Sequence, residues 1–202
     1  MQMPNLSLSV NQLTAETRKA ALGKGASYGM ADDIARAVEW LAHQGFVPCN
    51  ELSSYLDAPL EDEPKQPKIS DDAITVSGQL GLVDVAAGLD YIEAFPRQAL
   101  CLTDMRYPCL SLALAYLRQA PHFGSFTDDQ GGTLQDICMH APSDITLTLQ
   151  PFHRPAMPSW PARVMIDDII YQQLKNAAFQ TYVPSSDSSR EAGAGAGLND
   201  ND

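Results

Sequence analysis

The chain has 202 residues, of which 45% are hydrophobic and 19% are charged. These values are typical of a globular protein that is long enough to bury a core of useful size. The formal net charge is −12, with 13 lysines and arginines against 25 acids. Nucleic acid and anionic membrane surfaces are both disfavoured as partners, because phosphate groups are bound by clustered cations.

The cellular location of the protein is predicted from three features that the sequence does not show: a membrane-spanning run, a signal peptide and paired cysteines. No apolar run approaches the ~18 residues that a membrane-spanning helix needs. The first ten residues do not place a basic region before an apolar core, so we expect no signal peptide. The cysteines lack paired spacing and are interpreted as free thiols, which predicts a cytoplasmic protein. They are Cys49, Cys101, Cys109 and Cys138.

Residues 1–56 are predicted to form an N-terminal helical part. Ser9 and Gln12 have the spacing of a capping box, which can begin a helix. Apolar residues follow at helical spacing, and Gly23 or Gly25 is the expected end. A short turn of small residues then leads into a second helix, so the pattern predicts a helical hairpin.

The second helix has the clearest pattern in the chain. Asp32 and Asp33 are expected in its first turn and His43 in its last, where each charge suits the helix dipole. A shorter third helix is predicted from Pro48 to about Leu56. An acidic, proline-rich linker or loop at residues 57–72 follows.

Residues 73–180 are predicted to form an α+β body. Its expected strands lie at 73–77, 99–103, 125–127, 133–138 and 144–149, and its expected helices at 82–89, 109–117 and 164–180. A turn at 129–132 and a proline-rich connector at 151–161 complete this part. The predicted fold class is α+β: an N-terminal helical hairpin, a small and mainly antiparallel sheet with helices packed on one side, and an ordered, glycine-rich C-terminal tail. We expect these parts to make one compact domain.

Both ends of the chain resemble a known family. The N-terminal stretches are Leu8–Leu13, Ala20–Ala31 and Ala37–Leu41, and the C-terminal stretches are Thr181–Pro184, Ser188–Arg190 and Gly193–Asp202. They are similar to the domain of unknown function 3726 family, uncharacterised bacterial proteins of about this length. The C-terminal block, which reads GAGAGLNDND, is the more specific of the two. The middle, where Pro108-Cys109-Leu110 leads into an apolar helix, resembles the family more loosely. The family name implies no activity.

The C-terminal tail, residues 181–202, is the main candidate site. Three alternating glycines can turn successive backbone N–H groups toward an anion, because no Cβ atom obstructs the approach. Arg190 can bind a carboxylate or a phosphate through two parallel hydrogen bonds. Nearby serines can add hydroxyl contacts, so the candidate ligand-binding residues are Arg190, Ser185, Ser186, Ser188, Ser189, Gly193, Gly195 and Gly197. The alternative is a strap over the domain, with Arg190 paired to an acid.

Other polar clusters are weaker candidates. Asp200, Asp202 and the terminal carboxylate favour a solvated acidic end over a cation site, and we predict no metal and no cofactor. The histidines are scattered without metal-ligand spacing: His43, His122, His140 and His153.

Cys109, at the start of a helix, and Cys138, two residues before His140, could act as nucleophiles, although inert buried thiols are the commoner outcome. Asp104 and Arg106 either line a pocket or form a structural ion pair.

The combined pattern predicts a cytoplasmic protein of small-molecule metabolism. It would bind an anionic ligand, a carboxylate or a phosphate, where the tail folds back on the body, with Arg190 as the principal contact. The alternative is a non-catalytic accessory subunit, whose tail or helical hairpin docks on a partner enzyme or on a second copy of the chain. The sequence contains no complete triad, metal-ligand set or paired-carboxylate signature, so it predicts no particular reaction.

Overall fold

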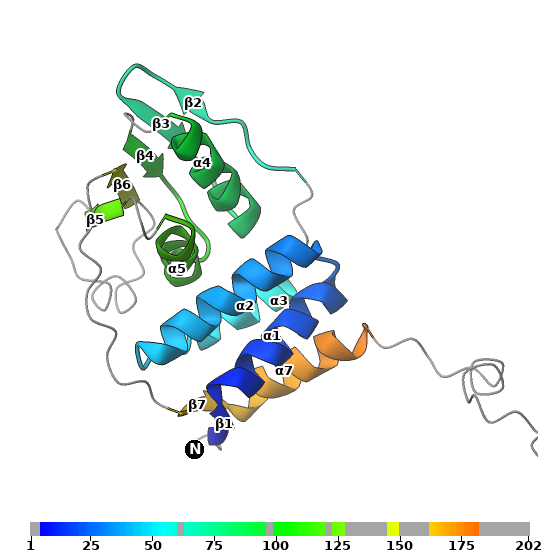
Figure 1. Ribbon diagram of the computed structural model, residues 1–202. Coiled ribbons are helices and arrows are strands. Elements are labelled where there is room, and N and C mark those ends of the chain that lie inside the picture. The colour runs from blue at the N-terminus through cyan, green and yellow to red at the C-terminus, as the bar shows by residue number, and fades with distance from the viewer. Residues whose placement is uncertain are drawn as a thin grey trace, which may run out of the picture.

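A computed structural model describes residues 5–59, 63–95, 99–119, 123–127, 145–149 and 162–181 (Figure 1). In chain order the elements are β1 (Asn5–Ser9), α1 (Val10–Lys24), α2 (Tyr28–His43), α3 (Cys49–Asp57), β2 (Lys68–Ile69), β3 (Ala73–Val76), α4 (Leu82–Ala94), β4 (Ala99–Leu102), α5 (Pro108–Gln119), β5 (Phe123–Thr127), β6 (Ile145–Leu149), β7 (Arg163–Asp167) and α7 (Asp168–Phe179). None of the helices in these residues is both long enough and apolar enough to cross a membrane.

The predicted helical hairpin is confirmed in α1 and α2. The Ser9 side chain accepts a hydrogen bond from the Gln12 N–H, and α1 ends at Gly25, whose φ of 102° is left-handed. The Ser27 side chain caps α2 in the same way, by accepting from the Met30 N–H. Because this cap starts α2 at Tyr28, the first turn contains no acid, and the expectation for Asp32 and Asp33 was wrong.

A two-stranded sheet at the base of the molecule joins the two ends of the described chain. Strand β1 pairs antiparallel with β7, so that Leu8 lies opposite Val164. The sequence pattern predicted a helix from residue 164, but residues 163–167 form a strand in which Val164 and Ile166 are buried and Met165 is exposed. Helix α7 begins only at Asp168, where the Asp167 side chain caps it.

The larger sheet has five strands in the order β2-β3-β4-β6-β5. Strands β3 and β4 are parallel and are connected by α4, whereas the other neighbours are antiparallel, which confirms a mainly antiparallel sheet. Strand β2 lies within the segment predicted to be a linker or loop. The predicted strand 133–138, the turn 129–132, the connector 151–161 and the tail residues 182–202 lie outside the described residues.

Helices α4 and α5 pack on one face of this sheet, as predicted. The buried face consists of alternate residues of β3 and β4: Ile74, Val76, Leu100 and Leu102. Gly88 lets α4 approach closely, because a Cβ atom there would lie 3.2 Å from the side chains of both Leu100 and Val76.

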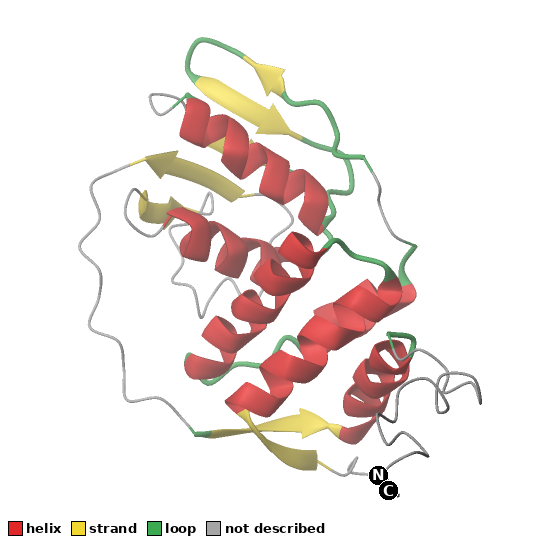
Figure 2. Ribbon diagram, turned by 45° about the vertical axis from the view of Figure 1, so that its right-hand side comes forward, coloured by secondary structure: helices red, strands yellow, loops and turns green. Residues whose placement is uncertain are grey.

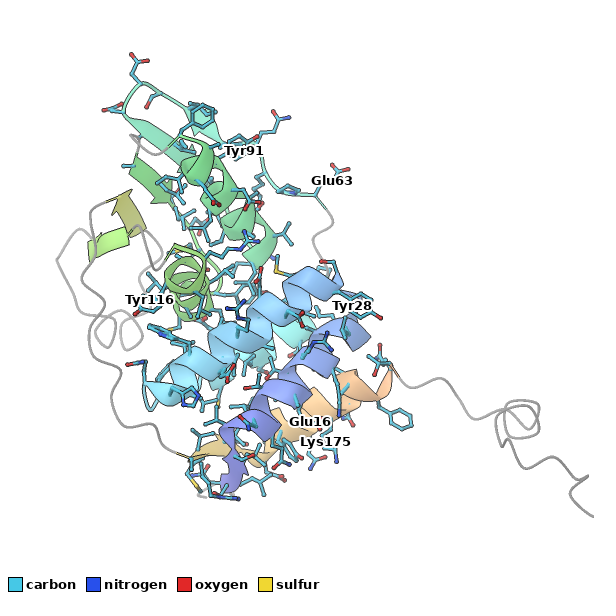
Figure 3. The ribbon with its side chains drawn as sticks, viewed as in Figure 1. Glu16, Tyr28, Glu63, Tyr91, Tyr116 and Lys175 are labelled. Carbon is cyan, nitrogen blue, oxygen red and sulfur yellow. The ribbon has the colours of Figure 1, made fainter. Side chains whose placement is uncertain are left out.

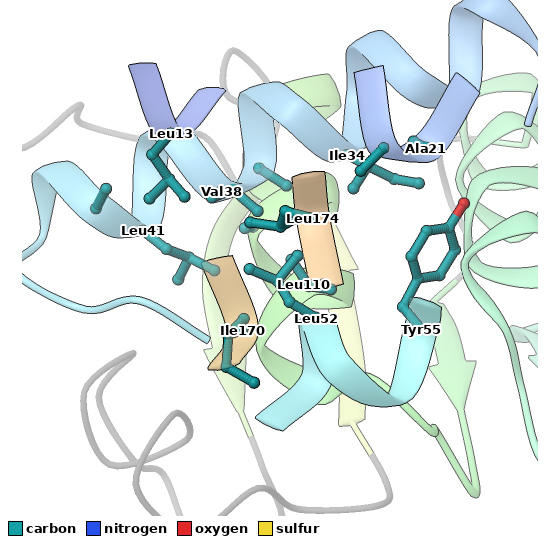
Figure 4. Close-up of a cluster of buried hydrophobic side chains, with 14 of the residues drawn as sticks. Leu13, Ala21, Ile34, Val38, Leu41, Leu52, Tyr55, Leu110, Ile170 and Leu174 are labelled. Carbon is teal, nitrogen blue, oxygen red and sulfur yellow. The ribbon is translucent and has the colours of Figure 1, made fainter. Parts of the chain in front are cut away.

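A second buried cluster unites α1, α2, α3 and α7 (Figure 4). Helix α5 contributes to both clusters, Leu110 to the helical one and Leu112 to the one beneath the sheet. Figure 2 shows the resulting order, with the helices between the small β1–β7 pair and the larger sheet. The central position of α5 agrees with its nearly uniform apolar sequence.

Candidate functional site

A cavity of about 320 Å³ lies where the ends of α1 and α3 meet the starts of α2 and α4. It lies beyond the carboxyl ends of β3 and β4, because the segments that follow these strands supply part of its wall. The volume is at the small end of the range for ligand sites. The lining residues are Lys24, Gly25, Ala26, Ser27, Met30, Tyr55, Pro59, Gly81, Leu82, Val83 and Tyr107.

Lys24 is the one charged residue among the described residues that line the cavity. Its ammonium donates hydrogen bonds to the carbonyl oxygens of Leu56, at 3.0 Å, and Ala58, so it also caps the end of α3. Burial lowers the pKa of Lys24, and the nearby Asp57 partly opposes this effect. An ammonium has three hydrogens, and no other acceptor in the described part of the chain bonds to this one. One hydrogen is therefore left for a ligand.

Tyr55 forms the wall beside Lys24. The Lys24 nitrogen lies 5.5 Å from the centroid of the Tyr55 ring, and this ring packs edge-on against Tyr107. Figure 4 shows the ring extending from α3 toward the part of α1 that carries Ala21.

The Tyr55 hydroxyl is an unused donor. Tyr55 is only 8% exposed, and within the described chain its hydroxyl has no hydrogen-bond partner. Burial raises the pKa of Tyr55 to about 12, so the hydroxyl stays protonated. A buried polar group without a partner costs about 1–3 kcal/mol.

At two of the helices that start near the cavity, an internal acid already offsets the positive end of the helix dipole. At α4, the buried Asp84 carboxylate accepts from the Gly81 N–H at 2.9 Å and from the Lys65 N–H at 2.6 Å. At α5, which starts just after Tyr107, the Glu51 carboxylate accepts from the N–H groups of Cys109 and Leu110. The N–H groups of Leu82 and Val83 in the cavity wall have no acceptor among the described residues, as is usual in a first helical turn.

The start of α5 bears on the predicted reactivity of Cys109. The Glu51 carboxylate accepts hydrogen bonds from the N–H groups of Cys109 and Leu110, both at 2.9 Å. Burial raises the pKa of Glu51, and these backbone donors oppose the rise. Because an acid at this helix start offsets the positive end of the dipole, the nucleophile alternative for Cys109 gains no support. Cys109 is buried, in line with the inert interpretation.

The predicted tail site lies outside the described residues, in 182–202: Arg190, Ser185, Ser186, Ser188, Ser189, Gly193, Gly195 and Gly197. Cys138, His122, His140 and His153 also lie outside them. No group of three or more His, Cys, Asp or Glu side chains in the described ranges is placed to hold a metal ion.

Asp104 and Arg106 tie together the loops that follow β3 and β4. An Asp104 carboxylate oxygen accepts from the Gln79 N–H at 2.7 Å, and Arg106 donates to the Gln79 side-chain oxygen at 3.1 Å. Gln79 and Asp104 both have left-handed backbones, with φ of 51° and 59°. These contacts hold the two loops together at the edge of the sheet where the cavity lies.

Sequence reasoning did not identify the cavity. Locally, Lys24 is a cation in the last turn of α1 and Tyr55 is a buried residue of α3. The cavity itself arises from four helix ends brought together by tertiary packing, and no local pattern signals that arrangement.

The chain is an α+β protein with a small cavity at one edge of its larger sheet. Residues 8–95 match the family model described as Protein of unknown function (DUF3726), which confirms the predicted resemblance to that family. All the residues described as lining the cavity except Tyr107 fall within the match. The C-terminal block of the resemblance lies outside it. Searches of curated proteins and of solved structures gave no significant match.

Proposed function

We propose that the protein binds a small anionic molecule, a carboxylate or a phosphate, in the cavity beside Lys24, and that it serves small-molecule metabolism in the cytoplasm. The observation that carries the proposal is the partly buried Lys24 ammonium, the one charged group in the described wall. A cation in a partly desolvated site favours a ligand of opposite charge, because the Coulomb attraction is stronger there than in open solvent.

The other polar groups of the wall support the same choice. The N–H groups of Leu82 and Val83 are donors without partners in the described chain. The carbonyl oxygens of Leu56 and Ala58 are instead occupied by Lys24. A wall with unused donors and no acidic side chain among its described residues suits an anion better than a cation.

The tail prediction stands beside this proposal as a separate claim. Arg190 and the three alternating glycines would supply a second set of donors if the tail closes over the cavity. A ligand held by the cavity alone would bind equally well to a chain truncated after Pro184. Truncation therefore separates the two sources of anion binding.

The proposal is tested by thermal-shift measurements with a panel of carboxylates and phosphates on the full chain and on two lysine variants. We expect at least one anion to raise the melting temperature, since binding to the native state stabilises it. Lys24→Met should abolish this shift. Lys175→Met is the matched control, because Lys175 also lies over a tyrosine ring, at 5.7 Å, but does not line the cavity (Figure 3).

Each variant is compared with its own ligand-free form, because Lys24→Met also removes the cap of α3. Equal shifts in the wild-type protein and Lys24→Met would place anion binding elsewhere and contradict the proposal. If no anion produces a shift, the accessory-subunit alternative is favoured instead.

A further inference from the structure

We propose that the ligand of the Lys24 cavity is a small monocarboxylate with a compact apolar body, not a phosphate ester. This inference rests on the proposed function and narrows it to one chemical class. It is carried by the charge that the wall can neutralise, by the donors that surround one small space, and by the apolar side chains that line the remainder.

The charge available in the cavity is at most one positive unit, because Asp57 lies near Lys24. Lys24 provides a single cation, and two of its hydrogens already bond to main-chain carbonyls. Of the three helices that start beside the cavity, α4 and α5 are compensated by Asp84 and Glu51, whereas α2 has no acid in its first turn and adds only the partial positive charge of a helix dipole. A phosphate ester carries about 1.5 to 2 negative charges at neutral pH. Its second charge would lie in a partly desolvated site without a partner, which is strongly unfavourable.

The donors also suit a two-oxygen group. The Lys24 ammonium and the Tyr55 ring border the same space, with the nitrogen 5.5 Å from the ring centroid. One carboxylate oxygen can accept from the ammonium, and the other from an N–H at the start of α4. The described wall contains no arginine, the side chain that most often binds phosphate through paired hydrogen bonds.

The remaining wall is largely apolar: Ala26, Met30, Pro59, Leu82, Val83 and Tyr107. Such a surface favours a hydrocarbon or aromatic body, because contact removes apolar area from water. The volume of about 320 Å³ corresponds to the space of ~10 water molecules. The ligand is therefore about the size of a short branched-chain or aromatic acid, with the carboxylate beside Lys24.

Isothermal titration calorimetry of the full chain tests this inference with four probes of related shape. Benzoate has both the single negative charge and the apolar body. Phenyl phosphate keeps the ring but has a phosphate in place of the carboxylate. Benzamide keeps the ring without the charge, and acetate keeps the carboxylate without the ring. We expect benzoate to bind at least tenfold more tightly than each of the other three. Lys24→Met should weaken benzoate at least tenfold. If Lys24→Met does not fold, Lys24→Gln removes the same charge and keeps a donor.

The outcomes separate this inference from the proposed function. Phenyl phosphate binding more tightly than benzoate, and losing affinity in the Lys24 variant, would overturn the monocarboxylate assignment and leave the anion site intact. Acetate binding as tightly as benzoate would overturn only the inference that the ligand has an apolar body. Benzamide binding as tightly as benzoate, or benzoate binding unchanged by loss of the Lys24 charge, would overturn both. A full chain that binds none of the probes would also overturn both.

Discussion

Gly23 of α1 lies against Ala177 of α7 so closely that a Cβ atom at position 23 would stand 1.9 Å from the Ala177 carbonyl oxygen. The contact joins the last described helix to the first, and the turn of α1 that makes it also carries Lys24. The position of the cavity ammonium therefore depends on a glycine that lets two helix backbones meet. Helix packing, more than the turn itself, explains why glycine is needed here.

We expect Gly23→Ala to lower the free energy of unfolding by about 1–3 kcal/mol, the usual cost of overpacking. Alanine favours a helix interior by up to ~1 kcal/mol over glycine, but a clash with a main-chain oxygen cannot be relieved by a change of rotamer. Urea denaturation measures the difference. Gly29→Ala is the control, because no atom lies within 4 Å of the added Cβ, and its stability should stay equal or rise. Equal stability of the two variants would refute the packing role of Gly23.

The parts of the fold that the sequence predicted are those whose signals are local. Ser9 caps α1 and Gly25 ends it, each through contacts within a few residues, so the hairpin is readable from sequence. The β1–β7 pair is different, because its partners are far apart in the chain. Val164 and Ile166 fit an apolar helix pattern as well as an alternating strand. Only the pairing with β1 decides between the two.

The candidate site shows the same limit. A lysine in a last helical turn and a tyrosine in an apolar stripe each have an ordinary local explanation. The structure is consistent with both explanations. Lys24 and Tyr55 differ from other such residues because tertiary packing places both of them beside the start of α4. A sequence reading that ranks motifs by composition therefore favours the tail, where Arg190 and the glycines are conspicuous.

Glu51 should give the protein a measurable pH dependence. Burial raises the pKa of this carboxyl above its ordinary value of 4.5, so the folded state binds the proton more tightly than the unfolded state. The stability contributed by this group is therefore fully present below about pH 4.5 and is lost as the pH rises through the folded pKa. Glu51→Gln cannot titrate. We expect the unfolding free energy of the wild type minus that of Glu51→Gln to fall across this window and then level off.

Chemical denaturation of both proteins in parallel, from about pH 4 to about pH 7, measures this difference, and the other titrating groups largely cancel. A difference that rises with pH would mean that the Cys109 and Leu110 N–H groups outweigh burial and hold the pKa of Glu51 below 4.5. That result would reverse the assigned direction.

Asp84 should hold the segment before β2 against α4. Its buried carboxylate accepts from the Lys65 N–H at 2.6 Å and from the Lys65 ammonium at 3.1 Å, besides the Gly81 N–H. We expect Asp84→Ala to cost about 1–3 kcal/mol, because backbone donors lose their acceptor. Limited trypsin digestion should cut faster after Lys65 and Lys68. Asp71→Ala, which removes an exposed acid between β2 and β3, is the control and should leave the cleavage rate unchanged. Equal rates in the two variants would show that Asp84 does not restrain the segment.

Arg118 of α5 allows a test of whether distance or burial decides the strength of an ion pair. It lies 3.2 Å from Asp33 of α2 and 2.8 Å from Asp90 of α4, but the Asp33 side chain is 21% exposed and that of Asp90 is 69% exposed. Solvent screening weakens an exposed pair more than 0.4 Å of extra separation weakens a partly buried one, because the effective dielectric constant changes several-fold and the distance hardly at all.

Double-mutant cycles that combine Arg118→Met with Asp33→Asn or with Asp90→Asn measure the two coupling energies by urea denaturation. We expect about 1 kcal/mol for the Asp33 pair and about 0.2–0.5 kcal/mol for the Asp90 pair. Added salt should reduce the Asp90 coupling further, since exposed charges are screened first. A larger coupling to Asp90 would mean that the shorter contact dominates. In that case Arg118 would mainly fasten α5 to α4, and its contact with the helical hairpin would contribute little.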